Sequence, residues 1–203
     1  MITVLDYGLG NVAAFVNIYK RLNMPVKVAA SADQLANAQR IILPGVGAFD
    51  WAMTRLNESG MRDCLDNLVV AKKRPVLGVC VGMQMMAKAS DEGKLPGLGW
   101  IDAQVKRFDE TRFTQQTHLP HMGWNDVTPA SSGGLFQGLH APRFYFLHSY
   151  FFAPANPADV VGVTDYNGSF TSVARSGNVF GTQFHPEKSH QWGIALLKNF
   201  AEL

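Results

Sequence analysis

Cysteine is scarce in this chain, which has only Cys64 and Cys80 among its 203 residues. Two cysteines without a paired spacing exclude a disulfide scaffold and fit a reducing compartment. We interpret Cys64, within "MRDCLDNLVV", as a helix-packing residue. The sequence also lacks any apolar run near the ~18 residues that a membrane span requires, and its first residues lack the basic start and cleavage site of a signal peptide. We therefore expect a cytoplasmic protein with no membrane partner.

The chain also lacks a large excess of charge of either sign: its formal net charge is +2. This value is too small to indicate a nucleic-acid partner, and we interpret the one basic cluster, "KKR" at 72–74, as a solvated helix end. His118 with His121, and His185 with His190, have no third ligand at a convincing spacing, so no metal site is expected. The phosphate-binding pattern G-x-x-x-x-G-K-[ST] is absent. We expect no cofactor.

Short apolar strands alternate with helical spacing in the first half of the chain. The strands are predicted at 2–8, 25–30, 40–49 and 75–80, and the helices at 11–22, 31–38, 48–58 and 61–71. Ser31 is a good N-cap for the second of these helices. Such alternation indicates a parallel, doubly wound sheet that is covered on both faces.

The second half of the chain has a different pattern. Residues 98–127 and 143–184 are rich in β-branched and aromatic residues, with turn signals such as "NG" at 167–168. They predict further, partly antiparallel strands that continue the sheet. The final stretch, 190–203, has the spacing of an amphipathic helix. With no linker, repeat or low-complexity tract, residues 1–203 are predicted to form a single α/β domain.

Three unusual stretches fall at the ends of predicted strands. They are "PGVGAF" at 44–49, "GVCVGMQ" at 78–84 and "FHPEKS" at 184–189. Sites in open α/β sheets form at the carboxyl ends of strands. We therefore expect the three stretches to converge on one site.

Cys80 lies between Gly78 and Gly82, where a strand is predicted to pass into a helix. A nucleophile on such a tight turn needs flanking glycines, because neighbouring backbone comes too close for a Cβ. The start of a helix also favours the thiolate. These features make Cys80 a candidate nucleophile, and a buried structural cysteine is the alternative.

The other two stretches supply candidate partners for this cysteine. In an extended segment His185 and Glu187 point to the same side, so the carboxylate can fix the tautomer of a histidine that accepts a thiol proton. A surface turn with an incidental His and Glu is the alternative. The glycines of "PGVGAF" can leave backbone N–H groups free for an oxyanion, although a plain strand-to-helix turn explains them equally well.

Seven motifs in order give the chain a family resemblance. They are "LDYGLGN", "LPGVGAF", "GVCVGMQ", "LPHMGWN", "YFLHSYF", "GTQFHPEKS" and "LLKNF". The sequence resembles the class I glutamine amidotransferases over essentially its whole length, most closely the glutaminase subunits of imidazole glycerol phosphate synthases. The resemblance implies a flavodoxin-like α/β fold with a mixed, mostly parallel central sheet flanked by helices.

The resemblance also implies a role for each matching residue. Cys80 would attack the carboxamide carbon of glutamine, His185 would carry the proton and Glu187 would hold the imidazole. The oxyanion would be met by backbone N–H groups of Val81 and of the turn at Gly45, Val46 and Gly47. Leucine usually follows the nucleophile in the family, and Val81 keeps the N–H that matters. The residues expected to grip the amino-acid end of glutamine are Gln84, Glu92, His148, Ser149 and Tyr150.

Further residues correspond to a partner face. Ammonia would pass from this chain into the (β/α)8-barrel cyclase subunit of imidazole glycerol phosphate synthase, in a heterodimer that serves histidine biosynthesis. The residues that the resemblance places on this face or on the ammonia channel are Asn11, His121, Met122, Gly123, Trp124, Asn125, Tyr145 and Lys188. Ordinary core packing is the alternative for the aromatic ones.

Three other functions stay open on the sequence alone. A similar glutaminase could supply a sugar amidotransferase in surface polysaccharide synthesis, and the segments 97–108 and 109–121 are not explained by the histidine pathway. A stand-alone cysteine γ-glutamyl hydrolase would need no partner. A non-catalytic module would have no need of all three residues Cys80, His185 and Glu187.

Overall fold

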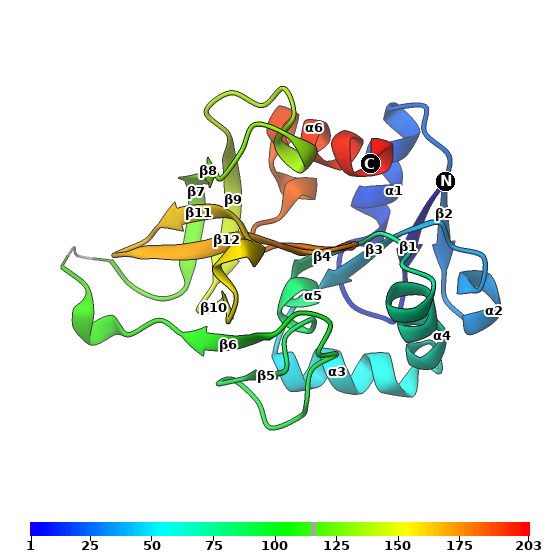
Figure 1. The fold of residues 1–203 in the computed structure, drawn as a ribbon, viewed down its shortest axis with the longest axis horizontal. Coiled ribbons are helices and arrows are strands. Elements are labelled where there is room, and N and C mark those ends of the chain that lie inside the picture. The colour runs from blue at the N-terminus through cyan, green and yellow to red at the C-terminus, as the bar shows by residue number, and fades with distance from the viewer. Residues whose placement is uncertain (115–116) are drawn as a thin grey trace.

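The computed structural model describes residues 1–114 and 117–203, which form an eleven-stranded mixed sheet, a second two-stranded sheet and helices on both faces of the large sheet (Figure 1). Part of the polar segment 109–121, namely residues 115–116, lies outside the described residues. The predicted α/β class is confirmed, with a sheet whose centre is parallel.

The centre of the large sheet consists of five parallel strands. In spatial order they are β2 (Val26–Ala29), β1 (Ile2–Leu5), β3 (Arg40–Gly45), β4 (Val76–Cys80) and β13 (Val179–Thr182). Every residue of β1, β4 and β13 is buried. Strands covered on both faces are apolar without alternation, which is how these runs read in the sequence.

Antiparallel pairing begins beyond β13. The sheet continues through β12 (Ser169–Ser176), β10 (Tyr150–Pro154), β6 (Ala103–Arg107) and β5 (Ala89–Ser90), while β11 (Val160–Asp165) and β8 (Thr128–Pro129) extend from β12. Strand β5 is again parallel to β6. The predicted antiparallel extension of the sheet is therefore present.

Two strands depart from the prediction. β7 (His121–Asp126) and β9 (Arg143–His148) pair only with each other in a separate antiparallel sheet, so the expectation that they continue the main sheet is wrong. The physical reason is that alternating hydrophobicity specifies a half-buried face and does not specify the neighbouring strand.

The helices cover both faces of the sheet. α1 (Val12–Arg21) and α6 (His190–Glu202) lie on one face, and α3 (Phe49–Glu58), α4 (Arg62–Asp66) and α5 (Val81–Gln84) lie on the other (Figure 1). α2 (Ala32–Leu35) follows β2 and begins after Ser31, whose hydroxyl accepts a hydrogen bond from Gln34 N–H as the sequence predicts. The shorter turns are a π-helical turn, Asn67–Ala71, and 3-10 turns at Glu110–Arg112, Gly134–Phe136, Pro157–Asp159 and Pro186–Lys188.

Candidate active site

Cys80 is the last residue of β4 and is followed at once by α5. Its φ of 56° lies in the left-handed region, which a residue with a Cβ adopts only when its surroundings hold it there. The turn is as crowded as predicted: a Cβ on Gly82 would lie 2.0 Å from the Leu43 carbonyl oxygen, and one on Gly78 would lie 2.6 Å from the Gly82 carbonyl oxygen. The two glycines are therefore required by close backbone approach.

The helix that follows Cys80 is short. α5 has only four residues, Val81–Gln84. One turn aligns only a few peptide dipoles, so the helix contributes little to stabilising a thiolate. Its first N–H groups still have no partner within the helix, and these include the Val81 N–H that was predicted for the oxyanion.

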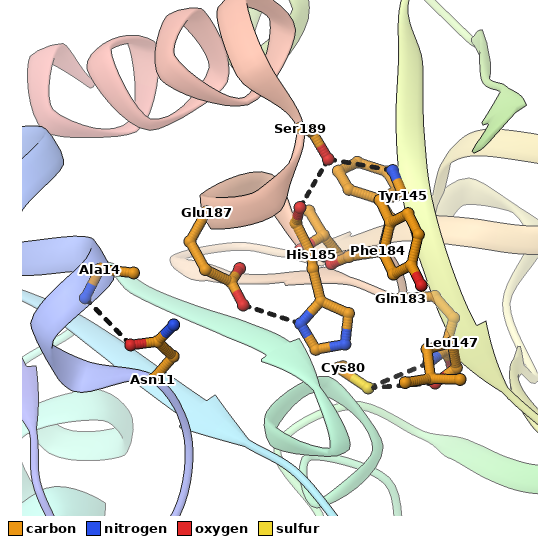
Figure 2. A network of polar contacts seen from close by, with 11 residues as sticks. Asn11, Ala14, Cys80, Tyr145, Leu147, Gln183, Phe184, His185, Glu187 and Ser189 are labelled. Atoms are coloured by element: carbon orange, nitrogen blue, oxygen red, sulfur yellow. Dashed lines mark hydrogen bonds and ion pairs between the residues drawn. The ribbon is translucent and has the colours of Figure 1, made fainter. Parts of the chain in front are cut away.

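His185 and Glu187 follow shortly after the end of β13, the parallel neighbour of β4. Parallel neighbours end at the same edge of a sheet, so this topology brings His185 to Cys80. The His185 Nδ1 lies 2.8 Å from Glu187 Oε1, and both side chains are almost fully buried. In Figure 2 the imidazole lies between the carboxylate and the sulfur atom.

Opposing effects act on His185. Burial lowers the pKa of the imidazole, but hydrogen bonds and charge interactions with Cys80 and Glu187 outweigh it and raise the pKa to about 10. The arrangement therefore favours the protonated form of the imidazole. A protonated histidine beside a thiolate is the resting state that a cysteine nucleophile requires.

Backbone contacts hold the His185 segment in place. The His185 N–H donates to the Tyr145 carbonyl oxygen at 2.9 Å. The Ser189 hydroxyl donates to the His185 carbonyl oxygen at 2.5 Å and accepts from Tyr145 N–H at 3.0 Å. Strand β9 of the small sheet is thus joined to the catalytic turn at two points (Figure 2).

A cavity of about 290 Å³ opens beside the Cys80 sulfur atom. It is lined by residues from all three predicted stretches and from the segment after β9. The predicted site residues among them are Val46, Gly47, Cys80, Val81, Gln84, Glu92, His148, Ser149, Tyr150, His185 and Lys188. The structure therefore brings the triad, the oxyanion turn and the expected glutamine-binding residues to one place, with Gly45 beside Cys80 in the strand register.

Tyr7 was not singled out in the sequence, although it lies within the quoted motif "LDYGLGN". Its hydroxyl is buried and donates to the Pro44 carbonyl oxygen at 2.6 Å, which holds the start of the predicted oxyanion turn. Burial, with the charge of Cys80, raises the pKa of Tyr7 above its usual range, so the hydroxyl keeps its proton as a donor. No periodicity in the sequence could have shown this contact between distant residues.

Gln183 was also missed. It is fully buried, and its Nε2 lies 4.0 Å from the Cys80 sulfur atom. Its Oε1 accepts a hydrogen bond from Gln84 Nε2 at 3.1 Å, and Gln84 Nε2 also donates to the Tyr150 carbonyl oxygen at 3.1 Å. A glutamine directly after a buried strand and two residues before a candidate histidine was the available signal.

Glu92 lines the cavity, as predicted for a residue that meets an ammonium group. One of its carboxylate oxygens accepts a hydrogen bond from Phe49 N–H at 2.9 Å, at the start of α3. This bond uses only Oε2 and fixes the carboxylate beside the cavity.

The residues predicted for the partner face differ in exposure: some are exposed or half-buried, and His121 is buried. Met122 and Trp124 are exposed on β7, at 65% and 39%, and Lys188 lies over the Tyr145 ring at 6.0 Å. Asn11 is exposed and caps α1. Gly123 and Asn125 are half-buried on the same strand as Met122.

His121 does not face outward. Its side chain is buried and stacks on Tyr166, with ring centroids 4.0 Å apart. Alternation along β7 directs His121 to the opposite side from Met122, so its side chain lies in the interior while the neighbouring Met122 is exposed.

Within residues 1–114 and 117–203, no group of three or more His, Cys, Asp and Glu side chains could hold a metal ion. Among the helices formed by those residues, none has the length and apolar character needed to cross a bilayer.

Comparison with known proteins identifies the family. The model of the glutamine amidotransferase class-I family matches residues 3–203, so the chain belongs to this family. Solved structures share the fold: a glutamine amidotransferase superposes with a TM-score of 0.76 at 22% identity, covering 99% of this chain and 97% of the other. A glutamine amidotransferase from Thermotoga maritima gives 0.64 at 17% identity, covering 99% and 82%.

Closer relatives carry a more particular name. The imidazole glycerol phosphate synthase subunit HisH of Bdellovibrio bacteriovorus is 57% identical over 100% of both chains, and that of Leptospira interrogans is 50% identical over the same share. The subunit HisH 2 of Pseudomonas aeruginosa is 46% identical, again over 100% of both chains.

Proposed function

We propose that this chain is the glutaminase subunit of an imidazole glycerol phosphate synthase, which hydrolyses L-glutamine to glutamate and ammonia. One observation carries the proposal: the Cys80 sulfur atom, paired with His185 and Glu187, opens onto the cavity that Gln84, Glu92 and Tyr150 line. Similarity to HisH subunits over the full length of the chain supports the choice within the family.

The first half of the reaction uses the thiolate and the imidazolium. The Cys80 thiolate attacks the side-chain carboxamide carbon of glutamine, and the carbonyl electrons move to the oxygen. Backbone N–H groups of Val81 and of the turn at Gly45–Gly47 meet this oxyanion. His185 then gives its proton to the departing nitrogen, so that ammonia leaves and a γ-glutamyl thioester forms.

The second half returns the enzyme to its starting state. His185, now neutral, takes a proton from water as the water oxygen attacks the thioester carbon. Collapse of the tetrahedral intermediate releases glutamate and the Cys80 thiolate beside an imidazolium. Glu187 holds Nδ1 at 2.8 Å throughout and stabilises the charge on the ring.

The relatives are named as subunits, which implies a second protein in each assembly. We propose that the partner here is the (β/α)8 cyclase of the synthase and that ammonia passes to it directly. Four exposed apolar side chains, Val46, Met122, Trp124 and Leu147, support a docking surface at the cavity, since Val46 and Leu147 line it and Met122 pairs with Leu147 across β7 and β9. Exposed apolar patches of this kind mark interaction sites.

The test is ammonia release from glutamine by the purified chain. It is measured alone, then with the cyclase encoded in the same genome, and then with the cyclase and its nucleotide ligand. We expect a low rate alone that rises steeply with both additions. A high rate without partner would instead identify a free-standing hydrolase, and no response to the cyclase would indicate a sugar amidotransferase as partner.

A variant of the nucleophile separates glutamine hydrolysis in this chain from the ammonia-consuming reaction of the partner. Cys80→Ala removes the nucleophilic sulfur atom from the cavity, so glutamine-dependent product formation by the complex should fall to background. Added ammonium salt should restore it, because the partner's own site is untouched. If ammonia fails to rescue the variant, the two reactions are not divided between two subunits.

A further inference from the structure

A line of hydrogen bonds runs from strand β7 to the wall of the glutamine cavity. Asn125 Nδ2 lies 3.2 Å from His121 Nε2, His121 Nδ1 lies 2.9 Å from His148 Nε2, and His148 Nδ1 lies 2.8 Å from the Tyr150 carbonyl oxygen. Both imidazoles are buried. The hydrolytic mechanism uses neither His121 nor Asn125.

The last acceptor settles the direction of every bond in this line. A carbonyl oxygen can only accept, so His148 Nδ1 carries a hydrogen and donates to Tyr150. Burial lowers the pKa of His148 to about 3 and that of His121 to about 4, so both rings are neutral near pH 7. The His148 Nε2 is then an acceptor for His121 Nδ1–H, and the His121 Nε2 is an acceptor for the Asn125 amide.

The line of hydrogen bonds ends on the Tyr150 carbonyl oxygen, which also orients the Gln84 amide in the cavity wall. The Tyr150 carbonyl oxygen accepts from Gln84 Nε2 at 3.1 Å as well as from His148. Gln84 Nε2 gives its other hydrogen to Gln183 Oε1, so its amide can adopt only one orientation and its Oε1 is left for other partners. Gln84, His148 and Tyr150 all line the cavity.

We propose that His121 is a positioning residue for glutamine: by donating to His148 it fixes the cavity wall formed by residues 148–150 and the amide of Gln84. The inference rests on the proposed function, because glutamine is the ligand that this wall would hold. His121 does not line the cavity and acts only through His148.

The test compares two substitutions of similar polarity at one position. In His121→Asn the amide nitrogen takes the place of Nδ1 and can still donate to His148. In His121→Gln the amide lies near the place of Nε2, so the donor to His148 is lost. Both are studied in the full complex with the cyclase, and steady-state kinetics are measured with glutamine and with ammonium salt.

We expect His121→Gln to raise the KM for glutamine about tenfold, the order expected when a buried acceptor loses its donor. The kcat for glutamine should stay within about twofold, because the triad is intact. His121→Asn should keep KM within about threefold of the unsubstituted protein. Ammonia-dependent activity should be the same in all three proteins. An unchanged KM in His121→Gln, or equal KM values in the two variants, would overturn the proposal.

Tyr166→Phe is the matched control for local destabilisation. It keeps the ring that stacks on His121 and removes a hydroxyl that donates to the His118 carbonyl oxygen at 2.6 Å. The thermal midpoint should fall while the KM for glutamine stays unchanged. A KM that rises in Tyr166→Phe as much as in His121→Gln would assign the effect to packing and overturn the proposal.

Failure of the proposed function would look different. If the unsubstituted complex shows no glutamine-dependent ammonia release, the substrate assignment is wrong and the positioning role falls with it. If that complex is active and the Asn and Gln variants behave alike, only the role of His121 is wrong. Nitrogen NMR of labelled imidazoles gives a direct check, since both rings should carry their hydrogen on Nδ1.

Discussion

At Cys80 one backbone angle decides what the side chain can do. With φ at 56°, the sulfur atom faces His185 across the end of the sheet (Figure 2), and the next residue, Val81, lines the cavity. The flanking glycines permit this geometry and the sequence predicts it. The sequence does not show that Tyr7 bonds to Pro44 or that Gln183 lies beside Cys80. These contacts join residues that are 37 and 103 positions apart in the chain.

The triad residues are expected to differ in how much activity they control. His185→Ala removes the group that carries the proton, whereas Glu187→Gln removes only the charge that orients it. We expect the loss of glutaminase kcat in Glu187→Gln to be roughly 10- to 100-fold smaller than in His185→Ala. Single-turnover ammonia release from the complex measures both. Equal losses would indicate that the two residues act as one inseparable unit.

At the scale of elements, the parallel pair β4 and β13 positions the proposed catalytic residues, and the small sheet of β7 and β9 lies beside them. Tyr145 of β9 bonds with the His185 segment, and His148 at the end of β9 meets the cavity. β7 presents Met122 and Trp124 to solvent and His121 to the interior. One short sheet therefore contributes residues both to the proposed partner face and to the proposed glutamine site.

The close approach of α5 to β3 makes a testable prediction at this scale. A Cβ at position 82 would lie 2.0 Å from the Leu43 carbonyl oxygen, so Gly82→Ala should displace the nucleophile turn. We expect a loss of about 1–3 kcal/mol in the free energy of unfolding, together with loss of glutaminase activity. Urea denaturation measures the first effect and ammonia release the second.

Gly133→Ala provides the comparison, because a Cβ there meets no heavy atom within 4 Å. Its free energy of unfolding should stay within about 0.5 kcal/mol of the unsubstituted protein. Similar losses in the two variants would show that crowding at Gly82 is not the cause.

At the scale of the whole molecule, buried histidines make stability depend on pH in two directions. The pKa of His185 is raised to about 10 from its ordinary value of 6.5, so the folded state binds the extra proton and this stability is lost as the pH rises from about 6.5 through 10. The pKa of His121 is lowered to about 4, so the unfolded state binds the extra proton and stability is lost as the pH falls below about 6.5.

We therefore expect the unfolding midpoint in urea to be highest near pH 6.5 and to fall on both sides. Cys80→Ala removes one anionic partner of His185 and should flatten the alkaline side. His121→Asn should reduce the slope on the acidic side without abolishing it, because His148, with a pKa lowered to about 3, still contributes. An alkaline slope that is the same with and without the sulfur atom would contradict the assigned cause.

The sequence by itself determined the α/β class and the central strands with their flanking helices, and it led to the proposed triad of Cys80, His185 and Glu187. These follow from local information: periodicity, turn residues and motifs whose members lie close together in the chain. The roles of Gly78 and Gly82 can be predicted in this way because the strained turn is local geometry. The same holds for His185 and Glu187, which share one side of a short segment.

Only the tertiary structure decided which strands pair and which way their polar side chains face. β7 and β9 leave the main sheet, His121 turns inward to His148, and Gln183 reaches the sulfur atom. Each of these depends on a pairing between distant segments, and an alternating pattern leaves both the partner strand and the buried side undetermined until the chain has closed on itself.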